Sequence, residues 1–252
     1  MKHCLKQRGL TLVELALVLL IVGLVSGGGL MVLTTQMEQN RIKETQRALA
    51  LAKEALIGFA QIHGRLPCPV NATSNGQVPS SFNPLDGNCP GVNPVGDVYI
   101  GYLPASTLGL SSATGGACEP GGSTSGYLMD GWNRCIRYAV SRADQNQINN
   151  AATRDNGIKI NYRPNVRVCR LQGCPLGRAQ ELVSDAVAVV FSTGKNGPGA
   201  SVDEAENLNY NRNFVMTTLR QDGAPNGAFD DIVDWLPRPT LINAMIAAGK
   251  LP

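Results

Sequence analysis

The chain has 252 residues, of which 43% are hydrophobic, 5% aromatic and 16% charged, with 22 Lys and Arg against 19 Asp and Glu. A chain of this length holds one ordinary domain with an attached segment. The low charge and a formal net charge of +3 exclude an electrostatically driven nucleic-acid binder and a charge-swollen disordered chain, because both need far more charge.

The N-terminus combines a short basic segment with a long apolar run. The basic residues of positions 1–9 precede residues 10–33, which are overwhelmingly apolar, and no polar side chain occurs from Leu15 to Val25. A helix of about 20 such residues crosses the hydrocarbon core of a bilayer. Because positive charge favours the cytoplasmic side, we expect residues 1–9 in the cytoplasm and the remainder of this single-pass protein outside it.

One charged residue interrupts the apolar run. Glu14 lies five residues into it, where an isolated charge costs on the order of 3 kcal/mol on insertion scales. A carboxylate at this depth needs a cationic partner, which makes Glu14 a candidate functional residue. Two alternatives are an ordinary secretory signal peptide and a plain single-span anchor. A signal peptide should end in a small-x-small cleavage site, which Val25-Ser26-Gly27 matches only loosely.

The order Lys-Gln-Arg-Gly-Leu-Thr-Leu-Val-Glu, from Lys6 to Glu14, resembles the type IV prepilin and pseudopilin signature. That signature is a short basic leader ending in Gly, followed by a hydrophobic segment with Glu at its fifth position. The resemblance implies that a membrane-embedded prepilin peptidase cuts the bond between Gly9 and Leu10 and methylates the new amine. It also implies that Glu14 pairs with the N-terminal amine of a neighbouring subunit during assembly. The family more often has Phe where this chain has Leu10.

A single long helix is expected from Leu10 to His63. Beyond the apolar run, apolar residues recur at helical steps of three, four and seven, and Gly64 with the following Pro67-Cys68-Pro69 ends the pattern. Each glycine in Ser26–Gly29 costs about 1 kcal/mol relative to alanine in a helix. These residues therefore indicate either a local interruption of the helix or tight packing against small side chains.

The remainder predicts a globular head. Residues 64–130 are rich in Gly, Pro, Ser and Asn and are typical of loops. Strand-like runs follow at 135–140, 158–162, 166–171 and 186–191, and a short helix at 241–248 ends at Gly249. The expected fold class is α+β and type IV pilin-like, with a long N-terminal helix, half transmembrane, packed on an antiparallel sheet. Its expected parts are a leader at 1–9, a membrane and assembly helix at 10–33, an amphipathic helical half at 34–63 and a periplasmic head at 64–252.

The cysteines indicate an oxidising compartment. Cys4 would be lost with the leader, and six remain, an even number. Six cysteines allow 15 pairings, of which sequential pairing is the simplest in a loop-rich head. The pairs expected on that basis are Cys68–Cys89, Cys118–Cys135 and Cys169–Cys174. A zinc site is not expected, because no C-x-x-C spacing occurs and the histidines are His3 and His63.

The sequence offers no enzymatic constellation. It contains no G-x-S-x-G, H-E-x-x-H or phosphate-loop motif, so no catalytic residue and no required cofactor are expected.

After residues 186–191 the chain continues through Ser192-Thr193-Gly194-Lys195-Asn196 to acidic residues within 203–206 and 230–234. This arrangement resembles the C-terminal loop of the major pseudopilins of type II secretion, which binds calcium through carboxylates and carbonyls. The resemblance is partial, since Lys195-Asn196 stands where an acidic residue is expected. The alternative is that these side chains are solvated loop carboxylates and local caps. The candidate Ca²⁺ ligands are Asp203, Glu204, Glu206, Asn207, Asp230 and Asp231.

The expected function is that of a pilin-like structural subunit, a pseudopilin or minor pilin, of a type IV pilus or a type II secretion pseudopilus. Its expected partners are prepilin peptidase, other pilin subunits and the inner-membrane assembly platform, because these serve the family that the signature resembles. No nucleic-acid partner is expected, since the chain after residue 9 carries 19 basic and 19 acidic residues. The alternative is a membrane-anchored extracytoplasmic binding or adhesive domain that forms no filament.

Overall fold

The computed structural model describes residues 11–92, 94–110, 116–145, 147–174, 180–199 and 201–251, without the side chains of residues 24–33 and 95. The chain divides into two compact units, Met1–Ile42 and Lys43–Pro252, and the first helix contributes to both. In chain order the elements are α1 (Leu12–His63), β1 (Pro94–Val95), β2 (Val98–Tyr102), β3 (Arg137–Ser141), β4 (Ala143–Asp144), β5 (Gln147–Ile148), β6 (Val166–Cys169), β7 (Glu181–Ser192), α2 (Val202–Leu208), β8 (Asn213–Val215), β9 (Ile232–Pro237) and α3 (Arg238–Ala247).

The long helix ends where the sequence predicts. α1 stops at His63, and Gly64 follows with a left-handed φ of 71° while its N–H donates to the carbonyl of Ala60 at 2.8 Å. A glycine in this conformation is a common end of a helix. Ser26–Gly29 are helical, so the interruption considered from the sequence does not form. Once a helix is nucleated, propagation through a few poor formers costs less than breaking its hydrogen-bond ladder.

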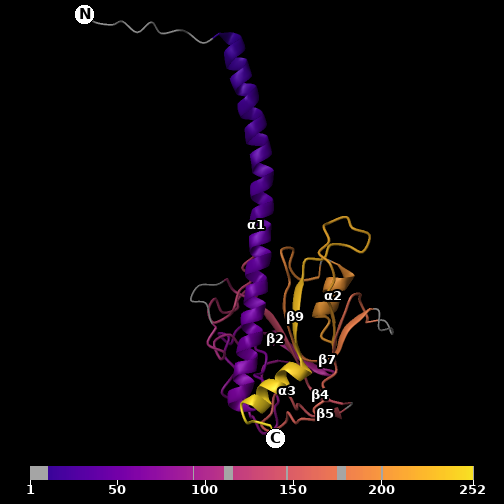
Figure 1. Ribbon diagram of the computed structural model, residues 1–252. Coiled ribbons are helices and arrows are strands. Elements are labelled where there is room, and N and C mark those ends of the chain that lie inside the picture. Colours follow the sequence, from indigo (N-terminus) through magenta and orange to yellow (C-terminus); the bar gives the residue numbers. More distant parts are fainter. Residues whose placement is uncertain are drawn as a thin grey trace, which may run out of the picture. The chain divides into compact units, whose positions relative to one another are not determined.

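A mixed sheet forms the centre of the second unit (Figure 1). Within the described residues it has seven strands in the order β1-β2-β3-β7-β6-β8, and β9 pairs with β7. The pairs are antiparallel except β6 with β8, so the α+β class is confirmed while the sheet is mixed instead of purely antiparallel. β7 has 12 residues and pairs with β3, β6 and β9, which places it at the centre.

The two faces of this sheet bury different cores. On one face, Leu49, Leu56 and other apolar side chains of α1 pack with Tyr99 and Val140 of the sheet, and α3 joins the same cluster through Leu241. This burial places the later part of α1 inside the second unit, which begins at Lys43, and agrees with the expectation that the outer half of the helix packs on the sheet. The opposite face forms a separate cluster that contains Val98, Ile100, Ala139, Val189, Phe191 and Phe214.

Two segments differ from the sequence-based expectation. Residues 158–162 form no strand, and the Arg238 side chain instead donates to the carbonyls of Ile160 and Tyr162. The expected loop region 64–130 contains β2, whose five residues are all buried. A strand buried on both faces lacks the alternation of apolar and polar residues that would reveal it in the sequence.

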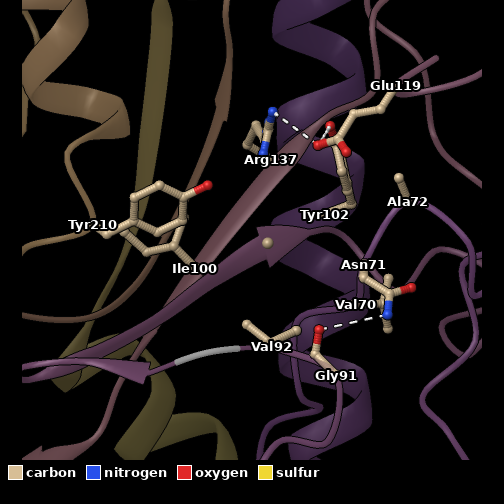
Figure 2. A pocket seen from close by; sticks show the side chains of 11 residues that line it. Val70, Asn71, Ala72, Gly91, Val92, Ile100, Tyr102, Glu119, Arg137 and Tyr210 are labelled. Atoms are coloured by element: carbon tan, nitrogen blue, oxygen red, sulfur yellow. Dashed lines mark hydrogen bonds and ion pairs between the residues drawn. The ribbon is translucent and has the colours of Figure 1, made fainter. Parts of the chain in front are cut away.

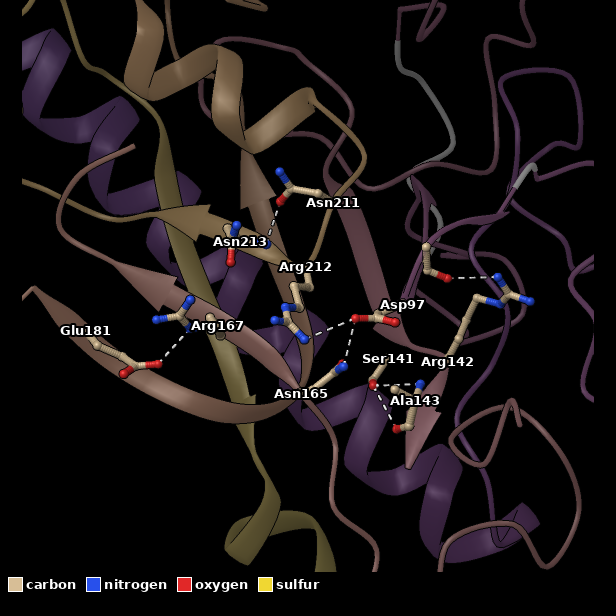
Figure 3. A network of polar contacts seen from close by, with 11 residues as sticks. Asp97, Ser141, Arg142, Ala143, Asn165, Arg167, Glu181, Asn211, Arg212 and Asn213 are labelled. Carbon is tan, nitrogen blue, oxygen red and sulfur yellow. Dashed lines mark hydrogen bonds and ion pairs between the residues drawn. The ribbon is translucent and has the colours of Figure 1, made fainter. Parts of the chain in front are cut away.

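A network of polar contacts lies next to this second apolar cluster (Figure 3). Asp97, in the turn between β1 and β2, accepts hydrogen bonds from Asn165 Nδ2 at 2.9 Å and Arg212 Nη1 at 3.2 Å. Arg167 on β6 donates to Glu181 Oε1 on β7 at 2.8 Å. These contacts hold the segments that precede β6 and β8 against the turn that precedes β2.

Candidate functional site

The first turn of α1 contains the candidate assembly residue. The N–H of Glu14 donates to Thr11 Oγ1 at 3.3 Å, and the N–H of Leu15 donates to the carbonyl of Thr11 at 3.1 Å. Thr11 is therefore the N-cap of α1, and Thr11-Leu12-Val13-Glu14 has the order of a capping box, in which a glutamate favours the positive helix end. This N-terminal capping position of Glu14 was not predicted from the sequence. Gly9 and Leu10, the predicted processing residues, lie outside the described residues.

The helix that follows Glu14 is apolar and exposed around its whole circumference. From Leu12 to Val22, the nine large apolar side chains are 49% to 87% exposed. An exposed apolar helix of this kind needs an apolar surrounding, such as lipid or other helices. Among the described residues, no helix combines the length and hydropathy of a membrane span, so the expected span over residues 10–33 stays a prediction.

Three carboxylates meet in the head. Glu204 on α2, and Asp230 and Asp231 before β9, each place an oxygen within 4.8 Å of the others. Glu204 Oε1 accepts the N–H of Asp230 at 2.8 Å, and Asp230 Oδ2 accepts the N–H of Asn196 at 3.1 Å. We call Glu204, Asp230 and Asp231 the carboxylate cluster.

The backbone makes room for this cluster at Gly194. Its φ is +60°, and a Cβ atom there would lie 1.9 Å from Asp230 Oδ1, so the position needs glycine. Asp130 supports the same loop, since its Oδ2 accepts from Ser192 Oγ at 2.5 Å, and the Ser192 hydroxyl oxygen accepts the N–H of Gly194. Arg134 Nη2 also donates to the carbonyl of Lys195 at 3.0 Å.

Within the described residues, three carboxylate oxygens of the cluster have no protein hydrogen-bond donor. Glu204 Oε2, Asp230 Oδ1 and Asp231 Oδ1 are buried and have no hydrogen-bond partner in the described part of the chain. Burial raises the pKa of Asp231 to about 8, with a further rise from Glu204 and Asp230, against a lowering by the hydrogen bond from Asn207. Burial also raises the pKa of Asp230, and Glu204 adds to this rise. Buried carboxylates that lack donors suit a divalent cation that takes oxygen ligands.

The structure separates the six predicted calcium ligands. Asn207 adjoins the cluster, because its Nδ2 donates to Asp231 Oδ2 at 2.8 Å. Asp203 instead forms an ion pair with Arg220 at 2.6 Å. Glu206 accepts hydrogen bonds from the side-chain amides of Asn209 and Asn211. Asp203 and Glu206 therefore already have polar partners outside the carboxylate cluster. They lie apart from Glu204 because neighbouring residues of a helix point in different directions.

The cysteines are paired as sequential pairing suggests. The described residues form the disulfides Cys68–Cys89, Cys118–Cys135 and Cys169–Cys174. Under a chain-entropy model, loops of this length contribute about 2–4 kcal/mol each.

A comparison with protein-family models identifies the N-terminal segment. Residues 4–30 match the prokaryotic N-terminal methylation motif. The chain carries the prepilin-type cleavage and methylation signature of type IV pilins and pseudopilins. This signature indicates a pilin-like or pseudopilin-like precursor, a structural subunit more than an enzyme, and it implies processing by a prepilin peptidase and assembly with other pilins. The α+β architecture with its long N-terminal helix and disulfides is consistent with the pilin-like fold. No curated protein and no solved structure matches the chain.

The carboxylate cluster predicts a pH dependence of the cation-free protein. Asp231 binds its proton more tightly in the folded state than in the unfolded state, where its pKa is the ordinary 3.8. The protonation of Asp231 therefore contributes to the free energy of unfolding at low pH, and this contribution is lost as the pH rises from about 4 to about 8. In chelator, the Asp231→Asn variant should gain free energy of unfolding over wild type across this range, by up to about 1.4 kcal/mol per pH unit.

Urea unfolding followed by tryptophan fluorescence, at several pH values, measures this difference. Asp222→Asn is the matched control, because Asp222 is an exposed aspartate outside the carboxylate cluster. A difference between Asp231→Asn and wild type that stays constant from pH 4 to pH 8 would contradict the prediction.

Proposed function

We propose that this chain is a pilin-like structural subunit, a pseudopilin or minor pilin, cleaved after Gly9 by a prepilin peptidase. The observation that carries the proposal is the methylation motif at residues 4–30, within which residues Leu12 to Val22 form a helix with exposed apolar side chains. In this proposal residues 10–33 hold the protein in the inner membrane, with residues 1–9 in the cytoplasm and the head in the periplasm.

The chemistry of assembly is assigned to Glu14 and the amine of Leu10. Cleavage after Gly9 would create a cationic amine four residues before Glu14 in the chain. In an apolar surrounding a carboxylate and an ammonium group stabilise each other strongly, because little water screens them. If the amine of one subunit pairs with Glu14 of the next, the pair neutralises both charges and fixes the axial offset between neighbouring helices.

The head suits a subunit in an oxidising compartment. Its three disulfides connect segments of the head, and disulfides of this kind are typical of secreted domains. Residues 64–252 make a large head for a pilin, which favours a pseudopilin or minor pilin of a type IV pilus or type II secretion pseudopilus, drawn into the filament by an inner-membrane assembly platform. The competing function is a membrane-anchored extracytoplasmic binding or adhesive domain without a filament.

Variants of Glu14 separate these two functions. We expect Glu14→Ala and Glu14→Gln to reach the membrane at wild-type level but to be lost from the filament fraction, because neither carries the charge that pairs with the amine. Glu14→Gln still suits a capping box. Glu44→Ala is the matched control, since Glu44 is an exposed glutamate of the same helix. Immunoblots of sheared filaments and membranes from the native host measure both fractions.

Two results would contradict the assembly role. Normal filament recovery for Glu14→Ala would favour the anchored binding domain. Normal recovery for Glu14→Gln with loss for Glu14→Ala would assign Glu14 a capping role only.

We also propose that the carboxylate cluster binds Ca²⁺. The three unpartnered buried oxygens of Glu204, Asp230 and Asp231 supply hard, anionic ligands, and the set contains no nitrogen or sulfur donor. Ca²⁺ takes six to eight oxygens in flexible geometry, so water or loop carbonyls would complete the shell. A bound cation would neutralise the mutual repulsion of the three carboxylates and stabilise the loop that contains Gly194.

Thermal unfolding of the full chain in chelator, then in Ca²⁺ or Mg²⁺, tests this proposal. We expect Ca²⁺ at 100 times its Kd to stabilise the wild type by about 2.7 kcal/mol. Asp231→Asn should lose this response while being more stable than wild type in chelator, and Asp222→Asn should respond as wild type does. No shift of the wild-type Tm on adding Ca²⁺ would rule out the site.

A further inference from the structure

A pocket opens on the face of the sheet that lies away from α1 (Figure 2). Tyr99 on β2 packs toward α1, whereas its neighbour Ile100 points to the opposite face and lines the pocket. The cavity has a volume of about 360 Å³. This size lies at the lower end of the range for small-molecule sites, which is about 300–1,000 Å³.

The pocket has an apolar base held in place by the disulfide-bonded loops. Val70, Val92 and Ile100 contribute side chains to it. Val70 pairs with Tyr102 through two backbone hydrogen bonds of 3.0 and 2.8 Å, and the Cys68–Cys89 disulfide joins the segments on which Val70 and Val92 lie. The base is therefore preformed.

An arginine and a glutamate stand together at one wall. The Arg137 guanidinium stacks over the Tyr102 ring, 4.1 Å from its centroid, and its side chain is 15% exposed. The Tyr102 hydroxyl donates to Glu119 Oε1 at 2.8 Å, whereas Arg137 Nη2 is 3.9 Å from that oxygen, beyond hydrogen-bonding distance. Within the described residues the guanidinium donates no hydrogen bond, so its donors stay available beside the acceptors of Glu119.

An aromatic side chain, Tyr210, lines the opposite wall of the pocket. Tyr210 lies in the loop after α2, is 43% exposed and has a left-handed φ of +61°. In Figure 2 its phenol oxygen lies on the side of the ring that faces Arg137. The pocket thus combines an apolar base, an exposed aromatic ring and a neighbouring donor and acceptor whose charges cancel.

We propose that this pocket binds a saccharide ring. A sugar hydroxyl both donates and accepts, so one pair of neighbouring hydroxyls can accept from Arg137 and donate to Glu119. The C–H surface of the ring can lie on Tyr210 or on the apolar base. Glu119 disfavours an anionic ligand, and Arg137 disfavours a cationic one. The ligand is a free sugar or a residue of a polysaccharide. This proposal is independent of the filament and calcium proposals.

Saturation-transfer difference NMR on the full chain tests the site with free sugars. The probes are the methyl glycosides of glucose, galactose and mannose, and N-acetylglucosamine, in a detergent without a sugar headgroup. We expect ring-proton signals for at least one probe, with binding weakened about tenfold or more in Arg137→Gln, which loses a charged donor. Arg170→Gln, at an exposed position, is the matched control and should bind as wild type does.

Tyr210→Asn provides a second variant that leaves the Arg137 stack intact. Asparagine tolerates the left-handed backbone at this position, so the variant should fold while losing the aromatic wall and most of the sugar signal. A printed glycan array with wild type and both variants tests the polysaccharide source. Binding to the array alone would assign the ligand to a polymer, and binding to the free probes alone to a small sugar.

Three outcomes would overturn the proposal. The first is the absence of binding in both the NMR and the array experiments. The second is sugar binding that both pocket variants retain, which would place it elsewhere. The third concerns phenylacetate, an aromatic anion, used as a probe in the same NMR experiment. Arg137-dependent binding of phenylacetate without any sugar binding would make the pocket an anion site.

Discussion

The burial of one side of α1 against the central sheet is the interaction on which the rest of the head depends. Leu49 and Leu56 are each 1% exposed, and Ala52 and Ala60 between and after them are fully buried. Burial of each leucine is worth about 1.5–3 kcal/mol, and the small alanines allow the helix to approach the strands closely. Lys53 Nζ, 2.5 Å from Asp234 Oδ2, connects the same helix to β9. Because β9 pairs with β7, the helix, the central strand and the acidic segment before β9 are positioned together.

The carboxylate cluster follows from this arrangement. The register of β9 against β7 pairs Ile232 with Ser192, so the residues just before β9 lie beside the loop just after β7. Gly194 leaves space for Asp230, and α2 brings Glu204 to the same place. The turn at Asp130 joins this loop to α1, since its neighbour Gly131 donates to Thr45 Oγ1 at 3.0 Å. A cation at the cluster would therefore stabilise a loop that is already connected to the long helix, so binding and the stability of the head are expected to be linked.

The sequence correctly predicted the structural features that depend on a local residue pattern. The helix end at Gly64, strands β3, β6 and β7, and the C-terminal helix α3 follow from periodicity and end signals. It missed β2, which is buried on both faces, and wrongly expected a strand at 158–162, whose carbonyls bind Arg238 instead. For the site, the acidic residues after a strand and their resemblance to a calcium-binding loop made Asp230, Asp231 and Glu204 candidates. The ion pair of Asp203 with Arg220, 17 residues away in the chain, could not be predicted. The pocket could not be predicted from the sequence, because Arg137, Glu119 and Tyr210 come from segments that only the tertiary fold brings together.

The central claim is that this chain is a prepilin-type precursor whose assembly chemistry begins at a new N-terminus. Its most direct test is the N-terminal sequence and intact mass of the protein extracted from membranes of the native host, with a Gly9→Ala variant beside it. The account predicts a mature chain that starts at Leu10 and carries an added methyl group, and an uncleaved Gly9→Ala variant. An intact Met1 in the wild type, or a cut near Gly27, would contradict it and would leave an anchored or secreted domain without a filament.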